Sequence, residues 1–339
     1  MGAMSSSTAI PASSGVGIDR DNTDLARTTM RRVSLRLLPF LFVLYICNFL
    51  DRTNVAIAAL QMNRDLHFSA TAYGFGAGIF SLGYALFEVP SNLVLARVGA
   101  RYWIARIMIT WGLVAAAMMF VHTPIQFYAL RFLLGVAEAG FVPGTLYYLS
   151  GWFPAAQRAW ALSRFLIAVP ISTAIGNPLG TWLLELDGIW GLAGWQWLFL
   201  LEGIPPVLLG FIVLAFLPDH PAGAPWLSVE QRDWLTTHLQ RGASSDRTGE
   251  RFFHASACAS LAALGCLSAA LLPHPLGRIA GLALVPVGVY GFYAPFWCVP
   301  TALLRGTAAA AGIALVGSLG HVAWTPIESL VLRDCTRDE

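Results

Sequence analysis

A polar stripe marks one face of an otherwise apolar segment near the start of the chain. Tyr45, Asn48 and Arg52 stand at positions i, i+3 and i+7, so a helix would place them on one face. The planar fork of arginine binds both oxygens of a carboxylate, which predicts an anion-binding position at Arg52. The alternative is a structural ion pair with Asp51 or with a glutamate of a neighbouring helix.

A second constellation of charged residues follows further along the chain. Arg131, Gly135 and Glu138 share a helix face at i, i+4 and i+7, and the glycine would let another helix or a substrate approach. Apolar surroundings would make protonation of Glu138 accessible, whereas a nearby positive charge would oppose it. A hydrogen-bonded packing residue is the alternative interpretation of Glu138.

Other patterns favour packing over chemistry. Gly74, Gly76 and Gly78 follow no predicted strand, so helix packing explains them better than nucleotide binding does. The histidines have no H-x-x-x-H spacing, the cysteines form no close C-x-x-C pair, and the sequence has no nucleophile elbow. We therefore expect no metal ligand, no cofactor and no catalytic residue.

The elements that must position these residues are membrane-spanning helices. Hydrophobic residues make up 56% of the chain and charged residues 12%, about half the charged share of a soluble domain. The mean hydropathy of +0.63 comes from repeated apolar runs of about 20 residues, the length that spans a bilayer as a helix. The net charge of +2 is too small to indicate a nucleic-acid partner.

Hydropathy predicts an all-α integral membrane protein of about nine spans. A disordered cytoplasmic tail is expected over 1–30, and the linker 218–251 carries Ser228 and Gln231, spaced as a capping box that opens a short amphipathic helix, which could lie on the membrane surface. Arginines gather in alternate loops, which places the N-terminus in the cytoplasm. The predicted spans are 37–60, 72–95, 103–121, 127–150, 159–184 and 197–217, then 254–272, 278–304 and 307–332.

Several separated motifs carry a family resemblance. They are Asn48–Asn54, the run from Gly83 to Asn92, Arg131–Gly135, Glu138–Phe141 with Pro143 and Gly144, and Ser245–Arg251. In this order they resemble the anion:cation symporter branch of the major facilitator superfamily, whose members import organic acids such as tartrate, phthalate, hydroxyphenylacetate and sugar acids with protons. The match covers roughly residues 31–320.

The resemblance implies two six-helix bundles around a midplane cavity. Residues 31–217 correspond to a complete first bundle and 252–339 to an incomplete second bundle, since Gln240–Ala243 run straight into the loop that should follow the eighth span. A sequence repeat supports this assignment, because Ala96–Arg101 resembles Asp246–Arg251. These two segments correspond to the gating loops of the family.

The resemblance also assigns roles to individual residues. The substrate-binding residues would be Arg52, Tyr45, Asn48, Tyr84 and Trp297, although a lone tryptophan near a span is more often a packing or interface residue. The proton-coupling residues would be Asp51, Glu138 and Arg131. The gating-loop residues would be Arg97, Arg101, Asp246, Arg247 and Arg251.

The chain departs from the family pattern at three positions. Ala96 replaces the usual aspartate of the first gating loop, Val169 replaces a polar residue of sugar-acid members, and Gly317 replaces a common asparagine. The apolar replacements favour a less hydroxylated acid as the substrate.

These observations predict a monomeric secondary transporter of the inner (plasma) membrane. Its partners would be a small organic anion, a proton and the lipid bilayer, without nucleic acid. A truncated, non-transporting remnant of such a transporter is the main alternative, because a second bundle that lacks two helices cannot complete alternating access. A membrane-embedded enzyme is a further alternative.

Overall fold

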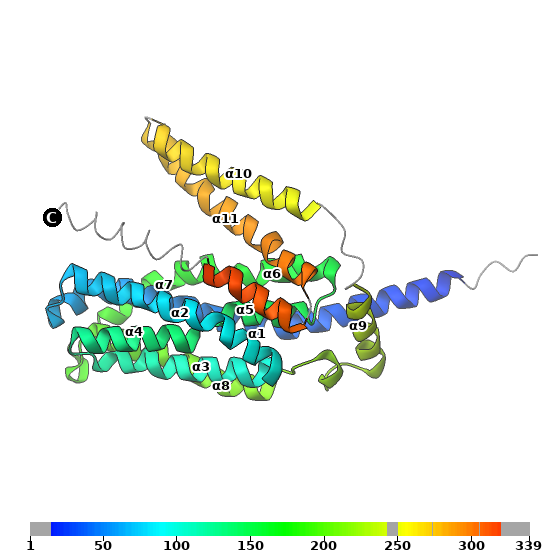
Figure 1. Cartoon of the computed structure of the whole chain (residues 1–339), viewed down its shortest axis with the longest axis horizontal. Helices are drawn as coiled ribbons and strands as arrows, with labels where there is room; N and C mark the ends of the chain where they lie inside the picture. The colour runs from blue at the N-terminus through cyan, green and yellow to red at the C-terminus, as the bar shows by residue number, and fades with distance from the viewer. Residues whose placement is uncertain (1–14, 243–249, 273, 305, 320–339) are drawn as a thin grey trace, which may run out of the picture.

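The computed structural model describes residues 15–242, 250–272, 274–304 and 306–319, which form helices and turns without a strand (Figure 1). Six helical segments in this part of the chain are long and apolar enough to cross a membrane. Each overlaps one of the first six predicted spans, so the all-α integral membrane fold with a complete first bundle is confirmed. The segments are Thr23–Leu66, Ala70–Val98, Ala100–Phe120, Pro124–Ser150, Ala155–Leu184 and Gly194–Phe216.

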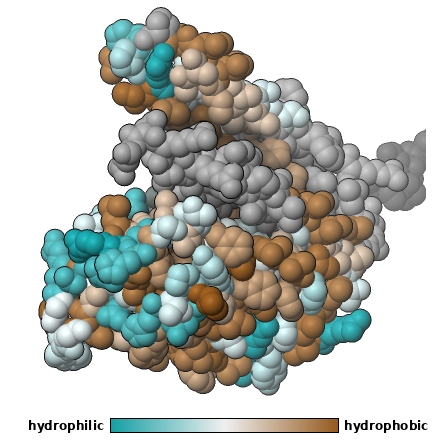
Figure 2. Space-filling view, turned by 60° about the vertical axis from the view of Figure 1, so that its left-hand side comes forward, coloured by the Kyte–Doolittle hydropathy of each residue, from teal (hydrophilic) through white to brown (hydrophobic). Residues whose placement is uncertain are grey.

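The outside of the bundle is apolar, as expected of a surface that faces lipid. Large hydrophobic side chains are exposed on several helices, for example Leu60, which is 89% exposed, and Ile125, which is 77% exposed. Figure 2 shows hydrophobic residues over much of the visible side of the molecule, with hydrophilic residues gathered toward one end of the bundle. A water-soluble protein rarely exposes so much contiguous apolar surface.

The first helix, α1 (Gly15–Leu66), is longer than the sequence predicted. The prediction began the span at residue 37 and expected a disordered tail over 1–30. The structure instead places residues 15–30 in the helix, with Met30 and Val33 buried against the rest of the protein. Burial of these apolar side chains stabilises a helical extension whose composition alone indicated disorder.

The fourth span is broken, although the sequence predicted one continuous span over 127–150. α4 (Pro124–Glu138) ends before Gly140, and α5 (Phe141–Ser150) begins directly after it. Gly140 has a φ of 88°, a left-handed conformation that glycine adopts without steric cost. The break therefore places Glu138 at a helix end, where its side chain is completely buried.

Glycines set the closest helix contacts of the bundle. α2 (Ala70–Val98) packs against α4 at Gly135, where a Cβ atom would clash with the carbonyl oxygen of Phe80 and lie 2.9 Å from Tyr84 N. The structure thus confirms that Gly135 permits the close approach of another helix. The third and sixth spans meet in the same way, with the Cβ position of Gly203 2.7 Å from Gly112 O.

The predicted linker 218–251 contains α9 (Val229–Gly242), whose capping box has formed. Gln231 N donates to Ser228 Oγ at 3.2 Å, and Ser228 N donates to Gln231 Oε1 at 3.3 Å. Gln231 Oε1 also accepts a hydrogen bond from Arg32 Nη1 of α1 at 3.1 Å. These bonds hold α9 against the N-terminal part of α1 (Figure 1).

The second half of the described chain comprises α10 (Glu250–Leu271), α11 (Pro275–Leu303) and the helical segment Gly306–Leu319. α10 and α11 pack along each other as a pair that extends obliquely from the bundle (Figure 1). They coincide with the predicted spans 254–272 and 278–304. The last predicted span, 307–332, is described only to residue 319, and its remainder lies outside the described residues.

The remaining helices connect and complete the bundle. They are α3 (Ala100–Ala117), η1 (Met118–Phe120), α6 (Ala155–Leu166), α7 (Ala168–Leu184), η2 (Ile189–Gly191), α8 (Gly194–Phe216) and η3 (Pro221–Gly223).

Candidate substrate-binding and proton-coupling site

Arg52 and Glu138 form a buried ion pair between α1 and α4. Arg52 Nε lies 2.7 Å from Glu138 Oε1, and Asn48 Nδ2 donates a hydrogen bond to the same oxygen at 2.7 Å. The Glu138 side chain is fully buried, whereas 25% of the Arg52 side-chain surface is exposed. Two donors on one carboxylate oxygen compensate for the desolvation of the charge. The polar stripe of α1 therefore faces the predicted acid of α4.

Aromatic rings surround the guanidinium group of Arg52. Its Cζ lies 4.7 Å from the ring centroid of Tyr84 and 5.8 Å from that of Phe80, which are distances of cation–π contact. Tyr45, about two helical turns before Arg52 on the same face of α1, stacks on Phe165 of α6 with ring centroids 4.6 Å apart. The structure thus brings Asn48, Arg52, Tyr84 and Glu138 together, with Tyr45 packed at the edge of the group.

Asp51 is buried beside the ion pair but is bonded within α1. Its Oδ1 accepts a hydrogen bond from Asn54 Nδ2 at 3.0 Å, and 1% of the residue is exposed. The charges of Glu138, Arg131 and Arg52 all act on its carboxyl group. Asp51 therefore belongs to the same electrostatic group as the ion pair without sharing its hydrogen bonds.

Arg131 is anchored to α2. Its Nε donates to Gly76 O at 3.4 Å, and its guanidinium group lies over the Phe80 ring at 4.7 Å. Because the same ring is also within reach of Arg52, Phe80 separates the two cations. Arg131 thus contributes positive charge near the site while its hydrogen bonds go to the backbone of α2.

Trp297 of α11 is buried in the apolar core that also contains Tyr45 and Tyr84. Its ring meets that of Phe296 edge-on, with the centroids 5.3 Å apart and an interplanar angle of 75°. These contacts match the packing interpretation of Trp297. Its place in the substrate cavity stays a prediction.

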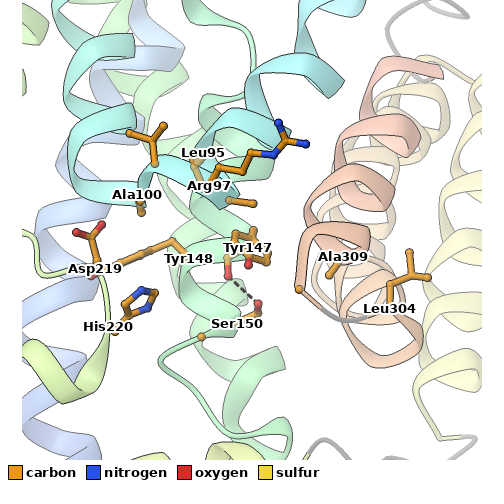
Figure 3. A pocket seen from close by; sticks show the side chains of 15 residues that line it. Leu95, Arg97, Ala100, Tyr147, Tyr148, Ser150, Asp219, His220, Leu304 and Ala309 are labelled. Carbon is orange, nitrogen blue, oxygen red and sulfur yellow. Dashed lines mark hydrogen bonds between the residues drawn. The ribbon is translucent and has the colours of Figure 1, made fainter.

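The first predicted gating loop lies at a cavity of about 510 Å³ between the bundle and the second half (Figure 3). Arg97 lines it and points toward the segment that contains Leu304 and Ala309. Asp219 and His220 line the side formed by the linker. The cavity thus lies between α2, the linker and the segment Gly306–Leu319.

Arg101 takes a different role in this loop. Its backbone N–H, at the start of α3, donates to Asp219 Oδ1 at 2.8 Å, so a carboxylate lies at the positive end of the helix. Sequence reasoning missed Asp219, which directly follows Pro218 at the end of an apolar span. The residues of the second predicted gating loop, namely Asp246, Arg247 and the side chain of Arg251, lie outside the described residues.

Two polar residues within the spans were also missed. Asn54 lies on the same face of α1 as Cys47 and Asp51, which precede it by seven and three positions. Glu202 is an acid inside the predicted span 197–217. The cost of an intramembrane charge, which identified Arg52, should have identified Glu202 as well.

Known proteins that are similar to this chain in sequence or in fold are described as transporters. A putative tartrate transporter of Agrobacterium vitis is 41% identical, aligned over 89% of this chain and 87% of the relative. The putative metabolite transport protein NicT of Pseudomonas putida is 37% identical, aligned over 95% of this chain and 91% of the relative. The crystal structure of the human organic anion transporter MFSD10 has the same fold, with a TM-score of 0.65 at 13% identity, covering 88% of this chain and 93% of that chain.

The alignment with the Agrobacterium relative also bears on the predicted internal deletion. It extends over 375 positions, more than the 339 residues of this chain, so part of the relative has no counterpart here. The predicted shortening is consistent with this difference. The relatives are described as transporters and not as enzymes, which confirms the prediction of a transporter rather than a membrane-embedded enzyme. The profile of the Major Facilitator Superfamily matches residues 41–237, and the chain belongs to this superfamily.

Proposed function

We propose that this protein binds a small organic carboxylate at Arg52 and couples its movement to that of a proton. The observation that carries the proposal is the 2.7 Å ion pair of Arg52 with the fully buried Glu138. A substrate carboxylate can replace Glu138 as the anion on the guanidinium group. Glu138 is then a buried carboxylate without a cation, and taking up a proton removes the cost of that charge. Anion and proton binding therefore favour each other.

The class of substrate is supported by the relatives and by the residues that replace polar family positions. The Agrobacterium relative is described as a putative tartrate transporter. Val169 is buried and offers no hydrogen bond to a substrate hydroxyl group, and Gly317 has no side chain at all. A carboxylate with few hydroxyl groups suits these apolar replacements better than a sugar acid does.

The orientation follows from the distribution of arginine. Arg27, Arg31 and Arg36 precede the first apolar stretch, and Arg97 with Arg101 follows the second span on the same end of the bundle. By the positive-inside rule this end lies in the cytoplasm. The protein then acts as a monomer in the inner (plasma) membrane, with the cavity of Arg97 on the cytoplasmic side.

The binding role is tested by calorimetric titration of the purified chain in lipid nanodiscs with succinate and L-tartrate. Arg52→Lys keeps the charge but loses the planar fork, so the affinity is expected to fall at least about tenfold, or ~1.4 kcal/mol. Arg64→Lys is the matched control, because the Arg64 side chain is 76% exposed and pairs only with Asp65 at the surface. Equal affinities of Arg52→Lys and the unaltered chain would exclude Arg52 as the anchor.

A second candidate function is binding without accumulation. Two observations favour it, because both indicate that the second bundle is incomplete. The alignment with the Agrobacterium relative extends over 375 positions against the 339 residues of this chain, and the described second half has three helical segments. Alternating access needs two bundles that rock around the central site. We therefore expect this chain in liposomes to bind carboxylate but to show little uptake driven by a proton gradient. Robust uptake by this chain alone would exclude the second candidate.

A further inference from the structure

Glu202 is a buried acid outside the site described so far. It lies in α8, is 8% exposed, and its Oε2 has no hydrogen-bond partner among the described residues. An ionised carboxylate inside a membrane span is costly unless a cation or several donors compensate for it. A proton on the Glu202 carboxyl group would remove this cost.

The packing of α8 fixes the direction of the Glu202 side chain. The next residue, Gly203, faces α3 at backbone distance, and at the end of the span Trp195 N donates to Gln61 Oε1 of α1 at 2.9 Å. With α8 held between these two helices, Glu202 lies beside Asn54 of α1. Asn54 Nδ2 in turn donates to Asp51 Oδ1 at 3.0 Å. A single amide side chain thus lies next to two buried carboxyl groups from different helices.

Among the residues that the structure describes, no cation compensates for a charge on the Glu202 carboxyl group. The ionisable groups that act on it from α1 are the carboxyl of Asp51 and the thiol of Cys47. Arg52 and Arg131 act on Asp51 and not on Glu202. Arg52 is paired with Glu138, and Arg131 is anchored to α2. Two negative charges in this position would repel each other strongly, and a single shared proton removes the repulsion.

We propose that Glu202 is a third proton-carrying carboxyl of this transporter, linked to Asp51 through Asn54. The acids then form a row across the bundle, from Glu202 on α8 through Asp51 on α1 to Glu138 on α4. When the proton passes from Glu202 to Asp51, one O–H bond breaks and one forms, and the charge of the pair is unchanged. The role of Glu202 in proton coupling rests on the proposed function, whereas the sharing of a proton between Glu202 and Asp51 does not.

Difference infrared spectroscopy of the purified chain in nanodiscs, recorded between acidic and alkaline pH, tests the shared proton without substrate. The unaltered chain should show a protonated carboxyl band that Glu202→Gln removes. Glu202→Asp should keep a shifted band, which separates loss of the proton from loss of the fold. Glu185→Gln is the matched control, because Glu185 is exposed at the end of α7, and it should leave the band unchanged.

Two further variants test the link to Asp51. Asn54→Leu and Asp51→Asn should each shift the pH at which the Glu202 band titrates. A spectrum of Glu202→Gln identical to that of the unaltered chain would overturn the proposal. If the band is lost but succinate does not bind to the unaltered chain at any pH, the shared proton stands and the proposed transport function fails.

Discussion

Ser318 donates its hydroxyl hydrogen to Glu88 Oε2 at 2.8 Å, although 230 positions separate the two residues in the sequence. Glu88 is 1% exposed and Ser318 is 8% exposed. The bond joins α2 of the first bundle to the segment Gly306–Leu319 of the second half. Gly317 allows this contact, because a Cβ atom there would clash with the carboxyl group of Glu88.

Ser318→Ala is expected to loosen the contact between the two halves. Loss of a hydrogen bond to a buried carboxyl group costs about 1–3 kcal/mol, so the thermal transition in detergent should fall and hydrogen exchange should quicken over 306–319. Ser260→Ala is the control, since the Ser260 hydroxyl bonds only to a carbonyl of its own helix at an exposed position. Equal exchange in both variants would show that the bond does not hold the segment.

Gly135→Ala is expected to destabilise the bundle, because the added methyl group meets the backbone of α2 at Phe80 and Tyr84. Overpacking of this kind costs about 1–3 kcal/mol. Gly74→Ala is the matched control, since nothing lies within 4 Å of its Cβ position and alanine favours a helix. The thermal transition should fall in the first variant and stay or rise in the second. The reverse order would contradict the packing at Gly135.

Gln231→Ala is expected to release α9 from α1. The substitution removes the hydrogen bonds of Gln231 Oε1 with Ser228 N and Arg32 Nη1. Hydrogen exchange should then quicken in the first turn of α9, because loss of such caps costs about 1 kcal/mol. Gln157→Ala, at an exposed position of α6, serves as the control. Unaltered exchange in α9 would mean that other contacts hold the helix.

The fold was largely predictable because hydropathy reports membrane spans directly. Each of the first six apolar runs is helical in the structure, the fourth and fifth in two pieces, since the bilayer leaves the backbone few other ways to satisfy its hydrogen bonds. The break at Gly140 was not predictable from hydropathy, because predominantly apolar sequence continues on both sides of it. The helical extension before residue 37 was missed because its stability comes from packing, which composition does not reveal.

The site was predictable to the extent that it follows helix periodicity. The spacing of Asn48 and Arg52 placed both on one face, and the pairing of Arg52 with a glutamate of a neighbouring helix was one of the two interpretations. The choice of Glu138 over Asp51 depends on how α4 ends against α1, which the sequence does not encode locally. The contact of Ser318 with Glu88 was missed for the same reason, since 230 positions separate the two residues. Asn54 and Asp51 are three positions apart on one helix, so helix periodicity could have predicted their contact.

Asp51→Asn is expected to weaken proton coupling while leaving carboxylate binding largely intact. The substitution removes one carboxyl of the acid group but leaves the Arg52 and Glu138 ion pair in place. The affinity for succinate should therefore remain within about threefold, or ~0.7 kcal/mol, while its dependence on pH becomes shallower. Titrations at several pH values check this result. A pH dependence as steep as that of the unaltered chain would remove Asp51 from the proton path.

The proposed function depends on the exchange of a carboxylate and a proton at the Arg52 and Glu138 pair, and proton uptake on ligand binding measures this exchange directly. The purified chain in weakly buffered solution with a pH indicator dye should take up protons when succinate binds, so that binding strengthens as the pH falls. Glu138→Gln should bind succinate with little proton uptake. Binding of succinate to the unaltered chain without proton uptake, or equal uptake by Glu138→Gln, would contradict the account.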